Sequence, residues 1–253
     1  MLEYVLIFLF AFFCEFVDAS LGMGYGTILS PVLIIIGYSP VIVIPSILLS
    51  QAIGGSIASI FHHREKNSIF TLKNENFKVV LLISILGVFA ICFSSYLGTI
   101  IPKKILKTYI GTLVFVMGII ISSNIKFKFT WRKILGLGLI SAFNKGLSGG
   151  GFGPVTTAGQ IIIGRNHKES VGVTTFSEVF ICLAGFLVYN IVGHVNNIIH
   201  YDVNLLLCLI FGCIFAAPAG VKLTKILPKR IMKHIMGILA ISLGCWTLIK
   251  TWL

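Results

Sequence analysis

Long apolar runs separated by short hydrophilic breaks form the dominant pattern of the sequence. The longest runs lie at about 41–61, 78–101, 106–122, 169–191, 203–221 and 231–252. A spanning helix needs about 20 apolar residues to cross a hydrocarbon core about 30 Å thick, and the runs lack the alternation of barrel strands. The pattern therefore predicts an all-α polytopic membrane protein, whose backbone hydrogen bonds are satisfied within helices.

Composition supports a membrane environment and removes one soluble alternative. Of the residues, 57% are hydrophobic and 11% are charged, with a mean hydropathy of +1.00, whereas a soluble domain has about 25% charged residues. A net charge of +12 would suit nucleic-acid binding if the basic residues formed one face. Instead, Lys and Arg occupy the breaks between apolar runs, which is the arrangement that sets membrane topology. We expect the lipid bilayer as a partner and no nucleic acid.

The six cysteines lie inside apolar runs, without the Cys-x-x-Cys spacing of metal or redox sites. We expect them to be small buried side chains, and we predict no metal site and no cofactor.

The chain starts with Met-Leu-Glu and lacks the basic region of a signal peptide. The first apolar run is therefore expected to remain in the mature protein.

The second half of the chain repeats the first at an offset of 127 residues. Segment 16–26 aligns with 143–153, so that the glycines at 22, 24 and 26 fall on those at 149, 151 and 153. Other matches are 34–37 with 161–164, 50–51 with 177–178 and, at an offset of 126, 100–107 with 226–233. The sequence thus predicts two repeats, 1–126 and 127–253, within one integrated transmembrane domain.

Each repeat is predicted to contain a short helix hairpin broken by glycines, followed by three long transmembrane helices. The hairpins span 2–37 and 134–164, and the long helices are the six runs given above. Each repeat has two short arms and three long helices. An odd number of membrane crossings inverts the second repeat relative to the first, as in many transporters.

The positive charges predict the same inverted arrangement. The break 190–204 contains no Lys or Arg, so it is placed outside. The basic breaks, which are placed inside, are 62–78, 124–133, 165–168 and 222–233. The break 102–107 is the exception, since it is basic and falls outside. Both termini are therefore predicted on the non-cytoplasmic side.

The glycine hairpins are the candidate substrate site. Segments 134–147 and 151–164 have 14 residues each, which makes helices of about 21 Å, too short for the hydrocarbon core. Two such helices meeting at a glycine break would present helix N-termini, with free N–H groups, to the centre of the protein as an anion site. The candidate residues are Gly22, Gly24, Gly26, Thr27, Gly149, Gly150, Gly151 and Gly153. Alternatively, the glycines only let the helices pack closely.

Four ionisable residues lie within apolar runs, namely Glu15, Asp18, Lys145 and Glu178. Each costs ~2.5–3.5 kcal/mol at a helix centre, so each needs a partner or a function. Asp18 and Lys145 occupy equivalent positions of the two repeats and are expected near each other. They form either a structural ion pair, or an anion site in which Lys145 supplies the countercharge.

The long helix after each hairpin carries matching polar positions. Ser50 and Gln51 follow the first hairpin, and Ser177 and Glu178 follow the second. We expect these faces to line a cavity for the substrate. The carboxyl of Glu178 is a candidate proton carrier, so that protons are a candidate coupling partner.

The repeated Gly-x-Gly-x-Gly hairpins, Leu-Gly-Met-Gly-Tyr-Gly at 21–26 and Ser-Gly-Gly-Gly-Phe-Gly at 148–153, resemble those of the TauE/SafE sulfite exporter family of membrane transporters. The following apolar runs, the chain length and the two-fold repeat are also similar. The resemblance implies a secondary transporter, not an enzyme, that moves a sulfur oxyanion or organosulfonate such as sulfite, thiosulfate or sulfoacetate across a prokaryotic plasma (inner) membrane. Thr27 stands where the second hairpin has Pro154, so the two helix ends are expected to differ.

Two other functions are compatible with parts of this pattern. A passive anion channel would use the same helix ends and basic residues as a carrier that works by alternating access. The segment Gly146-Leu147-Ser148-Gly149 matches the Gly-x-Ser-Gly of rhomboid intramembrane serine proteases. That chemistry needs a histidine beside the serine, and the candidates His194 and His200 lie in or beside the outside break.

Overall fold

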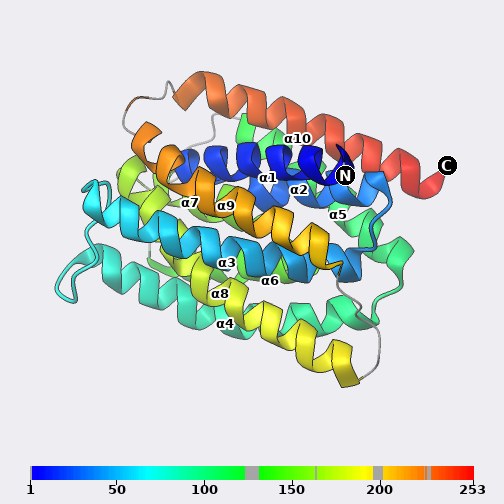
Figure 1. The fold of residues 1–253 in the computed structure, drawn as a ribbon. Coiled ribbons are helices and arrows are strands. Elements are labelled where there is room, and N and C mark those ends of the chain that lie inside the picture. Colours follow the sequence, from blue (N-terminus) through cyan, green and yellow to red (C-terminus); the bar gives the residue numbers. More distant parts are fainter. Residues whose placement is uncertain (1, 123–130, 163, 196–201, 225, 227–228) are drawn as a thin grey trace.

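A computed structural model describes residues 2–122, 131–162, 164–195, 202–224, 226 and 229–253. In this part of the chain the secondary structure is entirely helical (Figure 1). The helices are α1 (Leu2–Leu21), α2 (Tyr25–Ile36), α3 (Pro40–Arg64), α4 (Glu75–Ile100), α5 (Lys103–Ser122), α6 (Trp131–Ser148), α7 (Phe152–Ile162), α8 (His167–Val195), α9 (Val203–Leu223) and α10 (Lys229–Trp252).

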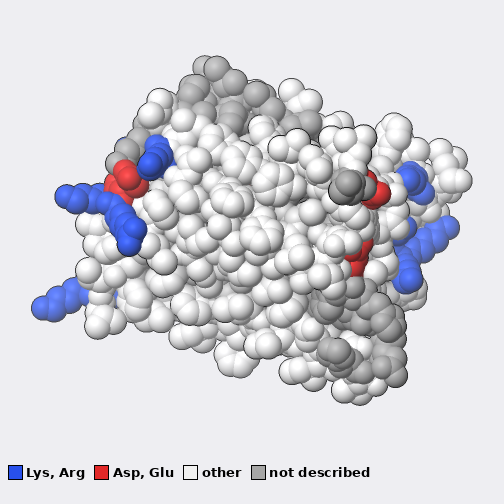
Figure 2. Space-filling model, in the orientation of Figure 1, with Lys and Arg blue, Asp and Glu red and all other residues white. Residues whose placement is uncertain are grey.

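The helices have the length and composition of membrane spans, which confirms the all-α polytopic class. In the described part, five are long and apolar enough to cross a bilayer, namely α1, α3, α4, α8 and α9. Figure 2 shows the charged side chains gathered at the two ends of the bundle, with a broad uncharged band between them. Large apolar side chains such as Phe89 and Phe215 are exposed on the outside of the bundle, as expected for a surface that faces lipid.

Local chemistry fixes where several helices begin and end. Asn74 caps α4, because its side chain accepts a hydrogen bond from the N–H of Asn76, 2.9 Å away, and Asp202 caps α9 in the same way. Pro40 occupies the first turn of α3, where a missing N–H costs nothing. Gly37 ends α2 with φ 127°, a backbone conformation that favours glycine.

The first arm of each hairpin is longer than the sequence suggested. Helix α1 runs on to Leu21 and has 20 residues, and α6 starts at Trp131 and has 18, whereas α2 and α7 have 12 and 11 residues. The sequence predicted that the first apolar run stops before Asp18, but a polar residue does not end a helix when its side chain finds partners inside the protein. Most of the predicted break 124–133, and residues 196–201 of the predicted break 190–204, lie outside the described residues.

Helices α1 to α5 of the first half correspond to α6 to α10 of the second. The contacts between helices follow the same pattern when corresponding helices are exchanged. Helix α1 packs on α9 as α6 packs on α4, and α3 packs on α9 as α8 packs on α4. Helices α3 and α8 pack on each other, and so do α5 and α10. Both termini lie at one end of the bundle, and the α3–α4 turn lies at the other (Figure 1). The orientation of the halves in the membrane stays a prediction.

Candidate functional site

Each hairpin is broken by two glycines whose backbone conformation other residues rarely adopt. Between α1 and α2, Gly22 has φ 70° and Gly24 has φ 139°. Between α6 and α7, the equivalent Gly149 and Gly151 have φ 72° and 81°. A side chain at any of these positions would strain the backbone. These four glycines therefore shape the two breaks.

The tips of the two hairpins pack directly on each other through further glycines. A Cβ atom added to Gly26 would lie 1.7 Å from the carbonyl oxygen of Gly149, and one added to Gly153 would lie 2.5 Å from that of Gly22. These two contacts join equivalent positions of the halves. A Cβ on Gly150 would lie 2.7 Å from the carbonyl carbon of Gly26. Close packing therefore accounts for Gly26, Gly150 and Gly153 in this conformation.

At each break, one backbone N–H is hydrogen-bonded to a side chain of the protein itself. At the start of α2, the N–H of Tyr25 donates to Oδ1 of Asp18 at 3.2 Å. Before α7, the N–H of Gly151 donates to Oγ1 of Thr27 at 3.1 Å. A carboxylate thus occupies a helix N-terminus at which an anion was predicted to bind.

Lys145 is buried, with 1% of its surface exposed, and it is paired with Glu178 rather than with Asp18. Its Nζ lies 2.8 Å from Oε1 of Glu178 and also donates to Oε1 of Gln51. The amide of Gln51 then donates through Nε2 to Oδ2 of Asp18 at 3.2 Å. The predicted neighbours Asp18 and Lys145 are therefore joined through Gln51, and we call the chain Asp18–Gln51–Lys145–Glu178 the central network.

The central network consists of two pairs of equivalent positions. Asp18 corresponds to Lys145, and Gln51 corresponds to Glu178, at the offset of 127 residues. Two members come from the hairpin arms α1 and α6, and the other two come from the long helices α3 and α8. Any movement of the hairpins against α3 and α8 must therefore break or exchange these polar contacts.

The remaining predicted residues lie beside the network with different partners. The hydroxyl of Ser50 lies 2.8 Å from that of Tyr25, so Ser50 is connected to the first hairpin. The hydroxyl of Ser177 instead donates to the carbonyl of Val173 in its own helix, at 2.8 Å, and the structure does not bring it into the network.

Three polar residues near the breaks were missed by sequence reasoning. Thr157 Oγ1 donates to the carbonyl of Gly22 at 2.7 Å, and Gln160 Nε2 donates to Oγ1 of Thr174 at 3.0 Å. Tyr25 is fully buried. The sequence offers a signal for Gln160, because an amide side chain is unusual inside an apolar run. It offers none for Tyr25, because aromatic residues are common in such runs.

Ser148, the serine of the protease-like segment, makes backbone contacts at the break. Its hydroxyl donates to the carbonyl of Asn144 at 2.7 Å and accepts from the N–H of Gly150 at 3.1 Å. One candidate base, His200, lies outside the described residues. The hydroxyl therefore helps to end α6 in this conformation, as side-chain caps do.

An equivalent pair of side chains also holds the ends of α1 and α6. His62 Nε2 lies 3.1 Å from the carbonyl oxygen of Ala19, and Tyr189 donates its hydroxyl hydrogen to the carbonyl of Gly146 at 2.8 Å. His62 and Tyr189 are equivalent positions, and so are Ala19 and Gly146. Each bond satisfies a carbonyl in the last turn of a broken helix, where the chain has no helical N–H to offer.

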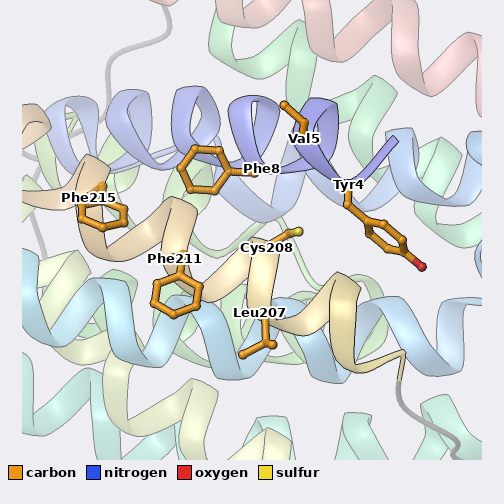
Figure 3. A pocket seen from close by; sticks show the side chains of 7 residues that line it. All are labelled: Tyr4, Val5, Phe8, Leu207, Cys208, Phe211 and Phe215. Carbon is orange, nitrogen blue, oxygen red and sulfur yellow. The ribbon is translucent and has the colours of Figure 1, made fainter. Parts of the chain in front are cut away.

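The outer surface carries apolar pockets that are separate from this site. One of about 460 Å³ lies between α1 and α9 (Figure 3). Its lining residues are Tyr4, Val5, Phe8, Leu207, Cys208, Phe211 and Phe215. None of these belongs to the central network, and an apolar lining offers little to an anion.

Long apolar helices, two glycine-broken hairpins and buried charges where they meet define the class of protein, a polytopic membrane protein with the discontinuous helices found in transporters. Residues 7–247 match the family model described as sulfite exporter TauE/SafE, so the chain belongs to this family of membrane transporters, as the hairpin motifs predicted. It is 27% identical over 258 residues to the probable membrane transporter protein YtnM of Bacillus subtilis (strain 168), covering 94% of this chain and 80% of that protein. No solved structure matches the chain.

Proposed function

We propose that the protein is a secondary transporter that moves a small anion of the sulfite, thiosulfate and sulfoacetate class by alternating access around the two glycine breaks. Membership of the sulfite exporter family supports the substrate class. We place the protein in the plasma (inner) membrane of a prokaryote, and the bacterial relative supports this location. Both termini are placed on the non-cytoplasmic side, because the basic breaks then face the cytoplasm.

The observation that carries the proposal is the buried position of Lys145 beside both hairpin tips. A buried ammonium group needs an anionic partner, because removing that partner leaves an uncompensated charge. Glu178 fills this role in the present conformation, at 2.8 Å. A substrate anion can take the same place on Nζ if the carboxylate of Glu178 moves away or takes up a proton. Gln51, which already contacts Lys145, offers an amide N–H to the same anion.

The first hairpin provides a second place of the same kind. Asp18 accepts the N–H of Tyr25 at the start of α2, where the helix dipole favours a negative charge. In the proposed cycle, the two carboxylates hold the places of the anion while the site is empty. An incoming anion exchanges these internal contacts for its own, and so frees the hairpins to move against α3 and α8.

Transport measured with purified protein in liposomes tests this function. We expect saturable uptake of labelled sulfite, thiosulfate or sulfoacetate, with acetate as a carboxylate for comparison. Lys145→Met should abolish the uptake, because no cation remains at the site, whereas Lys73→Met, which changes an exposed lysine, should behave as wild type. Uptake by Lys145→Met at the wild-type rate would refute the site, and a lack of flux for all three anions would refute the function.

A passive anion channel is separated from a carrier in the same liposomes. A carrier that alternates between two faces saturates with substrate and is accelerated by unlabelled anion on the opposite side. A channel shows no such acceleration, because it needs no conformational return step. We expect acceleration, since the central network ties the hairpins to α3 and α8 and must rearrange in each cycle.

The proposed orientation can be measured with an impermeant thiol reagent. In a cysteine-free background, a cysteine in place of the exposed Val203 should react from outside the cell, and one in place of the exposed Ile226 should not. The segments that contain them differ in basic residues, and the basic one is expected in the cytoplasm. Reaction of both from the same face would refute the inverted repeat.

A further inference from the structure

Glu15 is a buried carboxyl group outside the central network. It lies on α1 with 1% of its surface exposed. Its Oε2 is 3.7 Å from Sγ of Cys213 on α9, and a Cβ atom added to Gly54 of α3 would lie 3.0 Å from its Oε1. The carboxyl is therefore enclosed between α3 and α9, in the part of the protein that the membrane surrounds.

The surroundings of Glu15 do not compensate a negative charge. The nearby Lys145 is already paired with Glu178, at 2.8 Å. A thiol such as that of Cys213 is only a weak donor. An ionised carboxylate without a cation or strong donors is costly in an apolar interior. The neutral acid is the form that fits these contacts.

The other titratable groups around Glu15 add to this cost. Asp18 on the same helix and Glu178 on α8 are both acidic, and Lys145 on α6 is the one cation facing them in the described part of the chain. The thiols of Cys14 on α1, Cys182 on α8 and Cys213 on α9 and the hydroxyl of Tyr25 on α2 also face Glu15. Ionised Glu15 would thus place a third negative charge near a single positive one.

The fold itself does not require a carboxyl at this place. The equivalent position in the second half is Ala142, which is buried on α6, as Glu15 is on α1. An acid that the architecture can replace with a methyl group, and that is expensive in a membrane, indicates a function.

We propose that Glu15 is a proton-binding site that couples proton movement to anion transport, an inference that rests on the proposed function. In the buried conformation, Glu15 carries its proton. When the protein opens to one face, the carboxyl O–H bond breaks, the proton passes to a water molecule, and the carboxylate left behind is stabilised by that water. The empty protein returns with Glu15 ionised, through a conformation in which water still reaches the carboxylate, and Glu15 takes up a proton again on the first face before the next anion crosses. One anion and one proton thus cross together.

Glu15→Gln separates coupling from transport, because glutamine has the shape of the neutral acid and cannot release a proton. In liposomes loaded with a pH-sensitive dye, wild-type uptake of thiosulfate should be accompanied by proton entry and driven by an inward proton gradient. Sulfoacetate is used if thiosulfate is not moved. Both anions stay ionised near neutral pH, so the proton signal belongs to the protein. We expect Glu15→Gln to lose both effects but to keep anion exchange at equal concentrations. Glu3→Gln, at the exposed end of the same helix, is the matched control.

The outcomes for Glu15 and for the proposed function can be told apart. Anion flux without proton movement in the wild type, or unchanged proton movement in Glu15→Gln, would overturn the role of Glu15 and leave the transporter intact. No flux of any of the three anions in the wild type would overturn both. If Glu15→Gln does not fold, infrared spectra of the wild type and of Glu15→Ala test whether Glu15 is protonated. The band of a protonated carboxyl should be present in the first and absent in the second, and its presence in both would refute the proposal.

Discussion

At the tip of the first hairpin, Asp18 accepts a hydrogen bond from the start of α2, whereas at the equivalent position of the second hairpin Lys145 binds Glu178. The long helices differ in the same way, with neutral Gln51 in one half and acidic Glu178 in the other. The glycine contacts between the two hairpin tips show no such difference. Gly26 packs on Gly149 as Gly153 packs on Gly22.

This comparison shows why the two halves keep their glycines and change their charged residues. The central network lies where equivalent positions meet, so two identical halves would bring two acids or two bases together. Like charges in a buried site are strongly unfavourable, since one of them must become neutral. An acid in one half and a base in the other avoids this conflict. Glycine contacts carry no charge, so both halves can retain them.

The largest effect is expected where the halves are identical. Gly26→Ala should cost ~3 kcal/mol or more of stability and abolish transport, because its Cβ would overlap the backbone of Gly149 and no side chain can move away. Gly153→Ala should behave similarly. In Gly136→Ala the new Cβ meets nothing within 4 Å, so this variant should be as stable as wild type or more stable by ~1 kcal/mol. Thermal unfolding in detergent and liposome flux check the series, and equal behaviour of Gly26→Ala and Gly136→Ala would contradict it.

The next effect concerns the charges that differ between the halves. Glu178→Gln leaves Lys145 buried without its anion and should cost ~3 kcal/mol of stability. The double variant Lys145→Met with Glu178→Gln should recover the unfolding temperature, because no charge remains unpaired, but it should not transport. Recovery of transport in the double variant would show that Lys145 serves only the structure.

The exchange of Asp18 and Lys145 gives a sharper test of the same difference. In the variant Asp18→Lys with Lys145→Asp, the new aspartate would lie beside Glu178, and the new lysine would face the N–H of Tyr25. The first contact brings two negative charges together, and the second brings two hydrogen-bond donors together. We therefore expect neither stability nor transport to recover. If this variant had the unfolding temperature of the wild type, Asp18 and Lys145 would have to pair directly, contrary to the central network.

The sequence was sufficient for the parts of the fold that depend on regular patterns. Apolar length predicts spanning helices because the bilayer sets one thickness for all of them. The glycine matches at 22 and 149, and at 24 and 151, fall on the positions of positive φ. The family followed from the same hairpins and is confirmed by the match over 7–247.

The partners inside the site could not be derived in this way. The repeat offset identifies Asp18 with Lys145 and Gln51 with Glu178, but equivalent positions need not be the ones in contact. Whether Lys145 meets Asp18 or Glu178 depends on how α1, α3, α6 and α8 pack, to within a few ångström. The cap that Asp18 forms on Tyr25 depends on the path of the glycine break, which a pattern of residue types does not specify.

The smallest effect is expected at the side chains that cap α1 and α6. Tyr189→Phe removes one hydrogen bond to the carbonyl of Gly146 and should cost ~1 kcal/mol, or up to ~3 kcal/mol if the carbonyl stays without a partner. Helix α6 ends at Ser148, and the N–H of Gly150 is bonded to the Ser148 hydroxyl, so no helical donor can replace Tyr189.

His62→Phe should cost less than Tyr189→Phe, although His62 makes two hydrogen bonds. The carbonyl of Ala19 keeps the hydroxyl of Thr224, at 3.4 Å, and Asn67, which loses the ring nitrogen of His62, still donates to the carbonyl of Val221 at 3.2 Å. Equilibrium unfolding of the two variants measures the difference. A larger loss for His62→Phe would contradict this prediction and would mean that the first hairpin depends on its cap more than the second.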